Sequence, residues 1–486
     1  MPDAPADRPD ANLRRILSLR DVVGMTIVGV VGLRWIARSA RAGAPAVTLW
    51  VLACVAFFVP LAFTVAELSS RYPEEGGLYA WTRRAFGPRH GFLCAWCLWL
   101  NNLFYFPSLL LFAAANAFVV FGDRGAWLIN SRGASVAFVL VVLWICVWIN
   151  VVGLDLGRWL QNVGSAGVWL PAGLLIAMGA IGLARFGSAT SFAPHALLPR
   201  GDVWSTVSLW SAMCFAFSGF EITAFVSREI KDPRRTIPRG VVIAGLATTA
   251  IYLAGAVAVL VVVPASALSE RSGIPDAIAL VAGRLGLPGF GALTGALIAL
   301  GSIAGTSSWF AAAGRVPFAA SEDALVPAWF GRLHPRYQTP YVALLVQGVV
   351  ASLLFLASVF LSVTGAATSV QEAYDILVNL TILIYFIPYL YLFAALVRLR
   401  RKGDEGAPAA AVRVPGGRPG LWTTAALGLL ATVISLGLLF VPPPGTGSVA
   451  NYEANLIGQS AAVLALGALF YRLGRRRRRT AAPLAS

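Results

Sequence analysis

The chain has 486 residues, of which 58% are hydrophobic and only 12% carry charge, and its formal net charge is +16. Soluble domains average roughly 25% charged residues, so this composition excludes a soluble protein and indicates one that crosses a membrane many times. Apolar runs of about 20 residues match a hydrocarbon core about 30 Å thick and favour helices over a β-barrel. The basic residues fall mostly in short loops, so we expect no nucleic-acid-binding surface.

Twelve stretches of the chain are predicted to span the membrane as helices, and no soluble domain fits between them. The predicted spans are residues 21–40, 47–69, 90–121, 134–152, 162–184, 204–228, 240–263 and 289–318, followed by four that begin near residues 341, 370, 421 and 454. Residues 1–20 form a polar tail, residues 399–420 an Ala/Gly/Pro-rich linker, and residues 475–486 a basic tail.

The distribution of basic residues predicts the orientation of these spans. If residues 1–20 lie inside the cell, 29 of the 38 lysines and arginines fall on the inner side and 9 on the outer side. Loops on the cytoplasmic side of membrane proteins carry an excess of Lys and Arg. We therefore expect a multi-pass protein of the cytoplasmic membrane, with both termini and the linker in the cytoplasm.

Two of the predicted spans contain residues that weaken a helix. The sixth carries Ser218, Gly219 and the ionisable Glu221 in its middle, and the first carries Gly29 and Gly32. A helix that opens inside the bilayer is tolerated only where protein, water or a ligand meets its free N–H and C=O groups. We interpret both spans as broken helices that line a binding site; the alternative is a kinked packing helix in which Glu221 pairs with a neighbour.

The two interrupted spans are five spans apart and enter the membrane from opposite sides, which is the pattern of an inverted repeat. Residues 21–184, with five spans, then form the first repeat, and residues 204–398, with five more, form the second. Residues 421–474 add the eleventh and twelfth spans.

Four sequence segments occur together in a pattern known from other transporters. They are FAFSGFE at 215–221, KDPRRTIP at 231–238, ELSSRYP at 67–73 with GGLY at 76–79, and GRVPF at 314–318. In these segments and their order, residues 18–402 resemble an amino acid permease of the amino acid–polyamine–organocation (APC) superfamily of secondary transporters. The resemblance implies the LeuT-type fold of five plus five inverted repeats and transport by alternating access.

The resemblance also implies where the substrate binds. In that family the substrate's carboxylate meets backbone N–H groups at the break of the first helix, and its ammonium meets carbonyls freed in the sixth. Carried over to this chain, the substrate-binding positions are Thr26, Gly29, Val30, Val31, Gly32, Phe217, Ser218 and Gly219. The family's Gly-Ser-Gly is replaced here by Gly29-Val30-Val31, and a β-branched Val disfavours the positive φ of a carboxylate-binding nest.

Other polar and aromatic side chains at membrane depth are candidates for the same site. Asn101 and Tyr105 on the third span either face the cavity or make hydrogen bonds between helices. Phe220, like Phe217, is either a gate or packing. Two acidic residues near the outer end of the tenth span, Glu372 and Asp375, either attract a cationic substrate or pair with arginines.

We expect no cofactor apart from a coupling ion, which is either H⁺ or Na⁺. Glu221 is the best candidate for a group that binds and releases a proton. Hydroxyls of Thr306 and Ser307 on the eighth span are candidate sodium ligands, as in some family members. We expect no metal site, since His90, Cys94 and Cys97 have the only metal-like spacing and are better explained by packing.

The sequence therefore predicts a secondary transporter for amino acids, which is not an enzyme and whose partners are a small-molecule substrate and the lipid bilayer. A polyamine or other organocation carrier is the main alternative, because the carboxylate nest is imperfect. A substrate sensor that does not transport is a further alternative. A hydrolase using Ser218 is disfavoured, since no His or Lys lies inside a predicted span to act as its base. The oligomeric state is left open.

Overall fold

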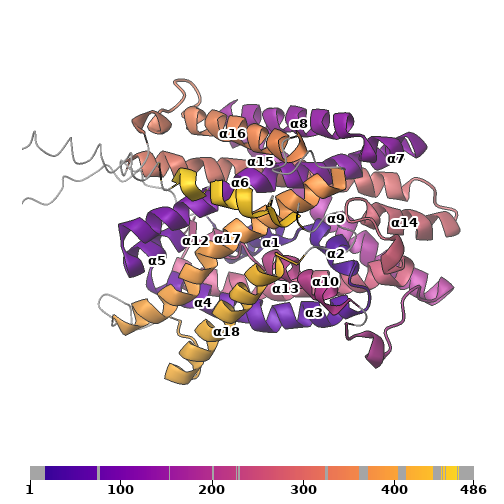
Figure 1. Cartoon of the computed structure of the whole chain (residues 1–486), viewed down its shortest axis with the longest axis horizontal. Helices are drawn as coiled ribbons and strands as arrows, with labels where there is room; N and C mark the ends of the chain where they lie inside the picture. Colours follow the sequence, from indigo (N-terminus) through magenta and orange to yellow (C-terminus); the bar gives the residue numbers. More distant parts are fainter. Residues whose placement is uncertain are drawn as a thin grey trace, which may run out of the picture.

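The computed structural model, drawn in Figure 1, describes much of the chain between residues 17 and 469. Its gaps are residues 74–76, 153, 200–201, 226, 228–229, 323–326, 361–369, 403–411 and 442–449 and the single positions 451, 455, 463 and 468. Residues 1–16 of the predicted polar tail, the basic tail 475–486 and residues 403–411 of the predicted linker lie outside the described residues.

Every regular element in the described part of the chain is a helix. Nine of these helices are long and apolar enough to cross a membrane, and a tenth span is counted if the bent pair α1 (Leu19–Val30) and α2 (Leu33–Ala40) is taken as one. The prediction of an all-α, multi-pass membrane protein is confirmed. The count of twelve spans and the inverted repeat stay predictions.

The long helices follow the predicted order along the chain. They are α3 (Pro45–Ala53), which continues through the π-helical turn η1 (Cys54–Phe58) into α4 (Val59–Arg71), then α6 (Pro88–Phe118), α8 (Arg132–Val152), α9 (Leu154–Phe186), α13 (Pro233–Val262), α15 (Phe290–Glu322), α16 (Tyr341–Phe360), α17 (Val370–Arg401) and α18 (Gly417–Leu438). The described positions between 450 and 469, in the region of the predicted twelfth span, are also helical.

Shorter helices connect these elements. They are α5 (Gly77–Phe86), α7 (Asp123–Asn130), α10 (Val203–Ser208), α11 (Trp210–Ala216), α12 (Ile222–Phe225) and α14 (Gly273–Arg284). Two boundaries differ clearly from the prediction: α9 begins at Leu154 and not at residue 162, and α13 begins at Pro233 and not at residue 240. Proline suits the first turn of a helix because its φ is already helical and its missing N–H would be unbonded there anyway.

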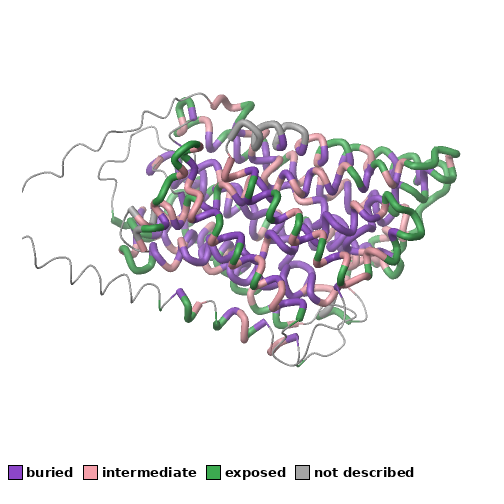
Figure 2. The backbone as a smooth tube through the Cα atoms, turned by 90° about the horizontal axis from the view of Figure 1, so that it is seen from above, coloured by how far each residue is buried: buried purple, intermediate pink, exposed green. Residues whose placement is uncertain are grey.

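The middle of the bundle is built around α6, α15 and α17. Helix α15 packs against α6 and α9, α17 packs against α6 and α18, and α1 packs against α13 (Figure 1). Buried residues are concentrated along the central helices (Figure 2). Large apolar side chains remain exposed on outer helices, among them Trp148 on α8 and Leu430 on α18. Such faces suit lipid, whose tails are as apolar as these side chains.

Both predicted interruptions are present in the structure. Helix α1 ends at Val30 and α2 begins at Leu33, with an angle of 44° between the two axes. Helix α11 ends at Ala216 and α12 begins at Ile222. Gly219 lies between them with φ +97°, a left-handed conformation that glycine adopts without steric cost. The sixth span is therefore broken and not merely kinked.

Candidate functional site

A small cavity of about 30 Å³ lies where the two breaks face each other. Its walls come from the two interrupted spans and from α6, α15 and α17. The lining residues are Gly29, Val30, Trp35, Asn101, Asn102, Tyr105, Phe215, Ser218, Gly219, Trp309 and Tyr385.

Six of the predicted substrate-binding residues line this cavity: Gly29, Val30, Asn101, Tyr105, Ser218 and Gly219. The other four, Thr26, Val31, Gly32 and Phe217, are not among its lining residues. The Thr26 hydroxyl donates to the carbonyl of Val22 within its own helix, at 2.7 Å. Sequence reasoning therefore placed the break residues of both spans in one region, and their roles toward a substrate stay predictions.

Tyr252 on α13 joins the two breaks. Its hydroxyl accepts the N–H of Gly32 at 3.1 Å and lies 2.9 Å from the carbonyl oxygen of Val30 and 3.2 Å from that of Ala216. The ring stacks on Trp50, with centroids 4.5 Å apart, and is fully buried. A single side chain therefore serves backbone groups at the ends of both α1 and α11, which would otherwise be unbonded.

Glu221, which closes the second break, is fully buried and bound to α17. The hydroxyl of Tyr385 donates to one carboxylate oxygen at 2.6 Å, and that of Tyr389 donates to the other at 2.7 Å. Tyr389 in turn accepts the N–H of Gly219 at 3.0 Å. The sixth span is thus broken, and Glu221 also pairs with neighbours, as the alternative expected. Its partners are the hydroxyls of Tyr385 and Tyr389.

The two asparagines of α6 serve helix packing as well as the cavity. The side-chain amide of Asn101 donates to the carbonyl of Thr381 on α17 at 2.8 Å, and that of Asn102 donates to the carbonyl of Leu98 in its own helix. Both residues also line the cavity. The two roles considered for Asn101 therefore coexist.

Phe217 and Phe220 are both fully buried and pack against Phe58. The ring centroids of Phe217 and Phe58 lie 5.2 Å apart and those of Phe220 and Phe58 lie 4.9 Å apart. Phe217 also meets the edge of Trp50. These contacts are aromatic packing at the second break; a gating role for Phe220 stays a prediction.

The hydroxyls considered for sodium already have partners within the helices. Thr306 donates to the carbonyl of Ser302 in α15 at 2.9 Å. Asn150 on α8 donates from its amide to the hydroxyl of Ser307 at 3.0 Å. A sodium site at these residues stays a prediction. Among the described residues, no group of three or more His, Cys, Asp or Glu side chains is placed to hold a metal.

Two buried arginines, Arg34 and Arg38, lie one turn apart on α2, beyond the first break. Arg38 donates to Glu270 at 3.0 Å, to Asp375 at 2.8 Å and to Asn379 at 3.2 Å, and Arg41 also pairs with Glu270. For Asp375, the expected pairing with an arginine is thus present. This group joins α2, α17 and the segment before α14, and we call it the Arg38 cluster.

Arg34 has a different environment. One of its terminal nitrogens donates to the hydroxyl of Ser108 at 2.9 Å. The guanidinium carbon lies 4.3 Å from the ring centroid of Trp35 and 4.6 Å from that of Tyr105, two rings that line the cavity. Among the described residues, its Nε and Nη2 atoms have no hydrogen-bond partner, although only 1% of the residue is exposed.

The "Amino acid permease" family model matches residues 17–465, which is nearly the whole chain. The chain belongs to the amino acid permease family. It is 28% identical to an uncharacterized transporter of Legionella pneumophila, over 92% of this chain and 94% of that protein. It is 26% identical to a probable agmatine/putrescine antiporter of Lactococcus lactis, over 81% of each chain. An uncharacterized transporter of Mycobacterium tuberculosis is 30% identical over 72% of this chain and 75% of its own length.

One of the segments that indicated this family has a structural role at the far end of the permease. Glu67 on α4 is fully buried and pairs with Arg400 on α17 at 3.2 Å and with Arg71 at 3.5 Å, and it accepts the N–H of Val414 at 2.8 Å. Since Arg400 lies 25 residues after Asp375, the two ion-pair clusters are about 37 Å apart along α17. Tyr385 and Tyr389 lie between them.

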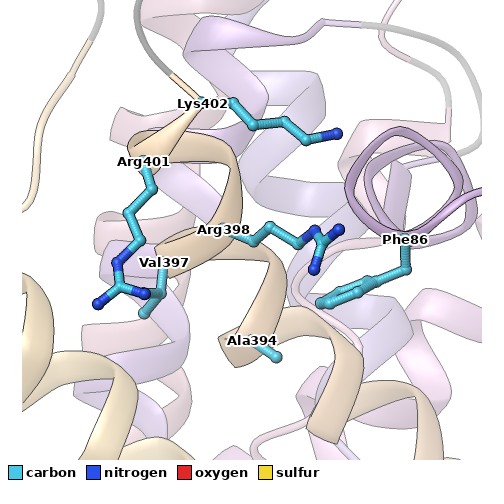
Figure 3. Close-up of a pocket in the computed structure, with 6 residues that line it drawn as sticks. All are labelled: Phe86, Ala394, Val397, Arg398, Arg401 and Lys402. Atoms are coloured by element: carbon cyan, nitrogen blue, oxygen red, sulfur yellow. The ribbon is translucent and has the colours of Figure 1, made fainter.

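A larger hollow of about 400 Å³ lies at this end of α17 (Figure 3). It is lined by Phe86, Ala394, Val397, Arg398, Arg401 and Lys402. The guanidinium of Arg398 lies over the ring of Phe86, 5.1 Å from its centroid. The hollow is open and basic, and it shares no lining residue with the small cavity between the breaks.

Sequence reasoning missed several residues that shape the permease's cavity. Tyr385 and Tyr389 follow each other at i and i+4 on one face of the tenth predicted span, and this spacing was the signal available for them. Tyr252 and Trp35 gave no such signal. Arg34 was visible as an arginine near the end of an apolar span, which in membrane proteins is a mark of function.

Proposed function

We propose that this permease is a secondary active transporter that moves an amino acid across the cytoplasmic membrane by alternating access, without covalent chemistry. The substrate binds between the break of α1 and α2 and the break of α11 and α12. Both termini and the linker lie in the cytoplasm.

The observation that carries this proposal is the position of the cavity. It is lined by residues of both breaks, and the Tyr252 hydroxyl reaches backbone groups of both. Interrupted helices leave polar backbone groups at membrane depth, which is where transporters of this architecture bind polar substrates. The ion-pair clusters around Arg38 and Glu67, at opposite ends of α17, are suited to hold the two sides closed in turn.

Proton coupling through Glu221 is part of the proposal. Its two oxygens accept one hydrogen bond each from Tyr385 and Tyr389. A proton on the carboxyl makes one oxygen a donor and weakens it as an acceptor, which favours rearrangement of one of these bonds. Protonation is thereby linked to the contact between the second break and α17. Sodium coupling through Thr306 and Ser307 is the alternative.

A polyamine or other organocation is the second candidate substrate. The similarity to a probable agmatine/putrescine antiporter favours it. A substrate sensor that binds without transport is the remaining alternative.

The test uses the purified full chain. Thermal stabilisation is measured across the twenty amino acids, agmatine and putrescine, because a ligand that binds only the native state raises its stability. Uptake of the ligands found is then measured in proteoliposomes with and without a pH gradient. Stabilisation and uptake by an amino acid support the proposal. Stabilisation without uptake or exchange supports a sensor, and stabilisation by amines alone supports the organocation carrier.

A further inference from the structure

Arg34 is a buried cation without a buried anion among the described residues. Its hydrogen bond to Ser108 and its two ring contacts leave Nε and Nη2 without partners. A charged group in the interior of a membrane protein is costly, and such groups as a rule pair with one another or face a functional cavity. A guanidinium can donate five hydrogen bonds in a fixed fork. Among the described residues, this one makes a single hydrogen bond, to Ser108.

The carboxylates of the Arg38 cluster and that of Glu221 are already engaged. Glu270 pairs with Arg38 and Arg41, and Asp375 pairs with Arg38 and accepts from Gln371. Across the cavity, both oxygens of Glu221 are bonded to tyrosine hydroxyls. The protein therefore supplies Arg34 with no carboxylate from these groups.

Two backbone N–H groups of the first break are also already bonded. The N–H of Val31 donates to the carbonyl of Ile27 at 2.8 Å, and the N–H of Gly32 donates to the Tyr252 hydroxyl at 3.1 Å. Val31 and Gly32 are extended, with φ of −68° and −104°. A nest of convergent N–H groups needs alternating right- and left-handed residues, and this break contains no left-handed residue.

We propose that Arg34 binds the carboxylate of the transported substrate, in place of the N–H groups of Val31 and Gly32. This inference rests on the proposed transport function and names its substrate class, a carboxylate-bearing amino acid. The two rings that hold the guanidinium, Trp35 and Tyr105, are also walls of the cavity. Arg34 itself is not a lining residue, so for it to contact a ligand there, one of these rings has to move aside. A diamine, which has no carboxylate, is disfavoured by the same positive charge.

The test compares ligands that differ by one carboxyl group. The pairs arginine and agmatine, ornithine and putrescine, and glutamate and γ-aminobutyrate differ by the α-carboxylate. Glutamate and glutamine, and aspartate and asparagine, differ by the side-chain carboxylate. Affinities are measured on the purified full chain by ligand-induced thermal shift or competition, for the wild type, Arg34→Gln, Arg34→Lys and Arg271→Gln.

Arg271→Gln is the matched control. Arg271 is also a buried arginine, 5% exposed, but it is bonded to Gln371 and to the carbonyl of Ile129, and it does not line the cavity. Its replacement also removes a buried positive charge. It should leave the ratio of affinities within each ligand pair unchanged.

We expect the wild type to prefer the carboxylate-bearing member of at least one set of pairs. Arg34→Gln should reduce that preference about ten- to hundredfold, since a hydrogen bond to a charged group is typically worth about 1.5–3 kcal/mol. Arg34→Lys should keep part of it, because the charge remains but the fork is lost. The set of pairs that responds identifies which carboxylate, α or side-chain, Arg34 binds.

A preference that is the same in the wild type and in Arg34→Gln overturns the inference and leaves the transport proposal standing. Preference of the wild type for the amines overturns the inference as well and supports the organocation carrier. No binding and no transport of any ligand overturns both. If Arg34→Gln does not fold, the methyl ester of the best amino acid is tested on the wild type, where an undiminished affinity overturns the inference.

Discussion

Arg34 and Arg38 are one turn apart on the same short helix, and both are at least 97% buried. Arg38 has two carboxylates and an amide as partners, whereas Arg34 has one hydroxyl and two aromatic rings. Burial alone does not tell these two cations apart. Their partners distinguish them: Arg38 is bonded to acidic and amide side chains, whereas Arg34 has N–H donors without a partner among the described residues. The comparison separates Arg38, which forms ion pairs within the protein, from Arg34, which we propose binds the substrate.

The largest effect is expected from Arg38→Gln. This change leaves Asp375, whose side chain is 14% exposed, without its arginine, and removal of one partner of a buried ion pair typically costs about 3–5 kcal/mol. Thermal unfolding of the purified protein measures it. Arg41→Gln is the control, because Arg41 is 20% exposed and Glu270 keeps Arg38 as its partner. An equal loss of stability in Arg38→Gln and Arg41→Gln would contradict the view that Arg38 is the more important of the two charges.

Glu221→Gln extends the comparison to the buried acid. Glutamine keeps one acceptor oxygen but places an NH₂ group toward a tyrosine that already receives the N–H of Gly219. We expect a loss of about 1–3 kcal/mol in stability and a transport rate that no longer varies with pH. Initial rates in proteoliposomes across a pH series check this. An unchanged pH profile would remove Glu221 from the coupling step.

Tyr252→Phe tests the uncharged hydroxyl that is hydrogen-bonded to backbone groups of both breaks. The change leaves the part-buried N–H of Gly32 without its acceptor, at an expected cost of about 1–2 kcal/mol in the free energy of unfolding. In the background of Arg34→Gln it also frees that N–H for a carboxylate. Partial recovery of carboxylate preference in the double variant would sharpen the assignment of Arg34. Ligand competition on the two variants measures it.

The smallest effect on stability is expected from Arg34→Gln, within about 1 kcal/mol of the wild type without ligand. Since an unpaired buried charge is costly, its loss offsets the lost contacts to Ser108 and the rings. The same thermal unfolding measurement serves here, with and without the best ligand. Destabilisation as large as that of Arg38→Gln would mean that Arg34 is also a structural charge.

The sequence was informative where the signal was local. Ser218, Gly219 and Glu221 within an apolar run predicted the second break, and Gly29 and Gly32 predicted the first. From the sequence, Asp375 could either attract a cationic substrate or pair with an arginine. The structure shows the pairing, because Arg38 lies 2.8 Å from Asp375. Tyr252 was not predicted, because it lies 220 residues from Gly32 and only the packing of α13 against α1 joins them. The unpaired state of Arg34 likewise depends on which acids the fold gives to other arginines.

The Tyr252 hydroxyl carries one proton but faces two carbonyls, those of Val30 and Ala216. A phenol donates a single hydrogen bond at a time. When it donates to the carbonyl of one break, the carbonyl of the other lacks this donor, and rotation about the C–O bond of Tyr252 exchanges the two. The two breaks are thus not independent, because they share one hydrogen-bond donor.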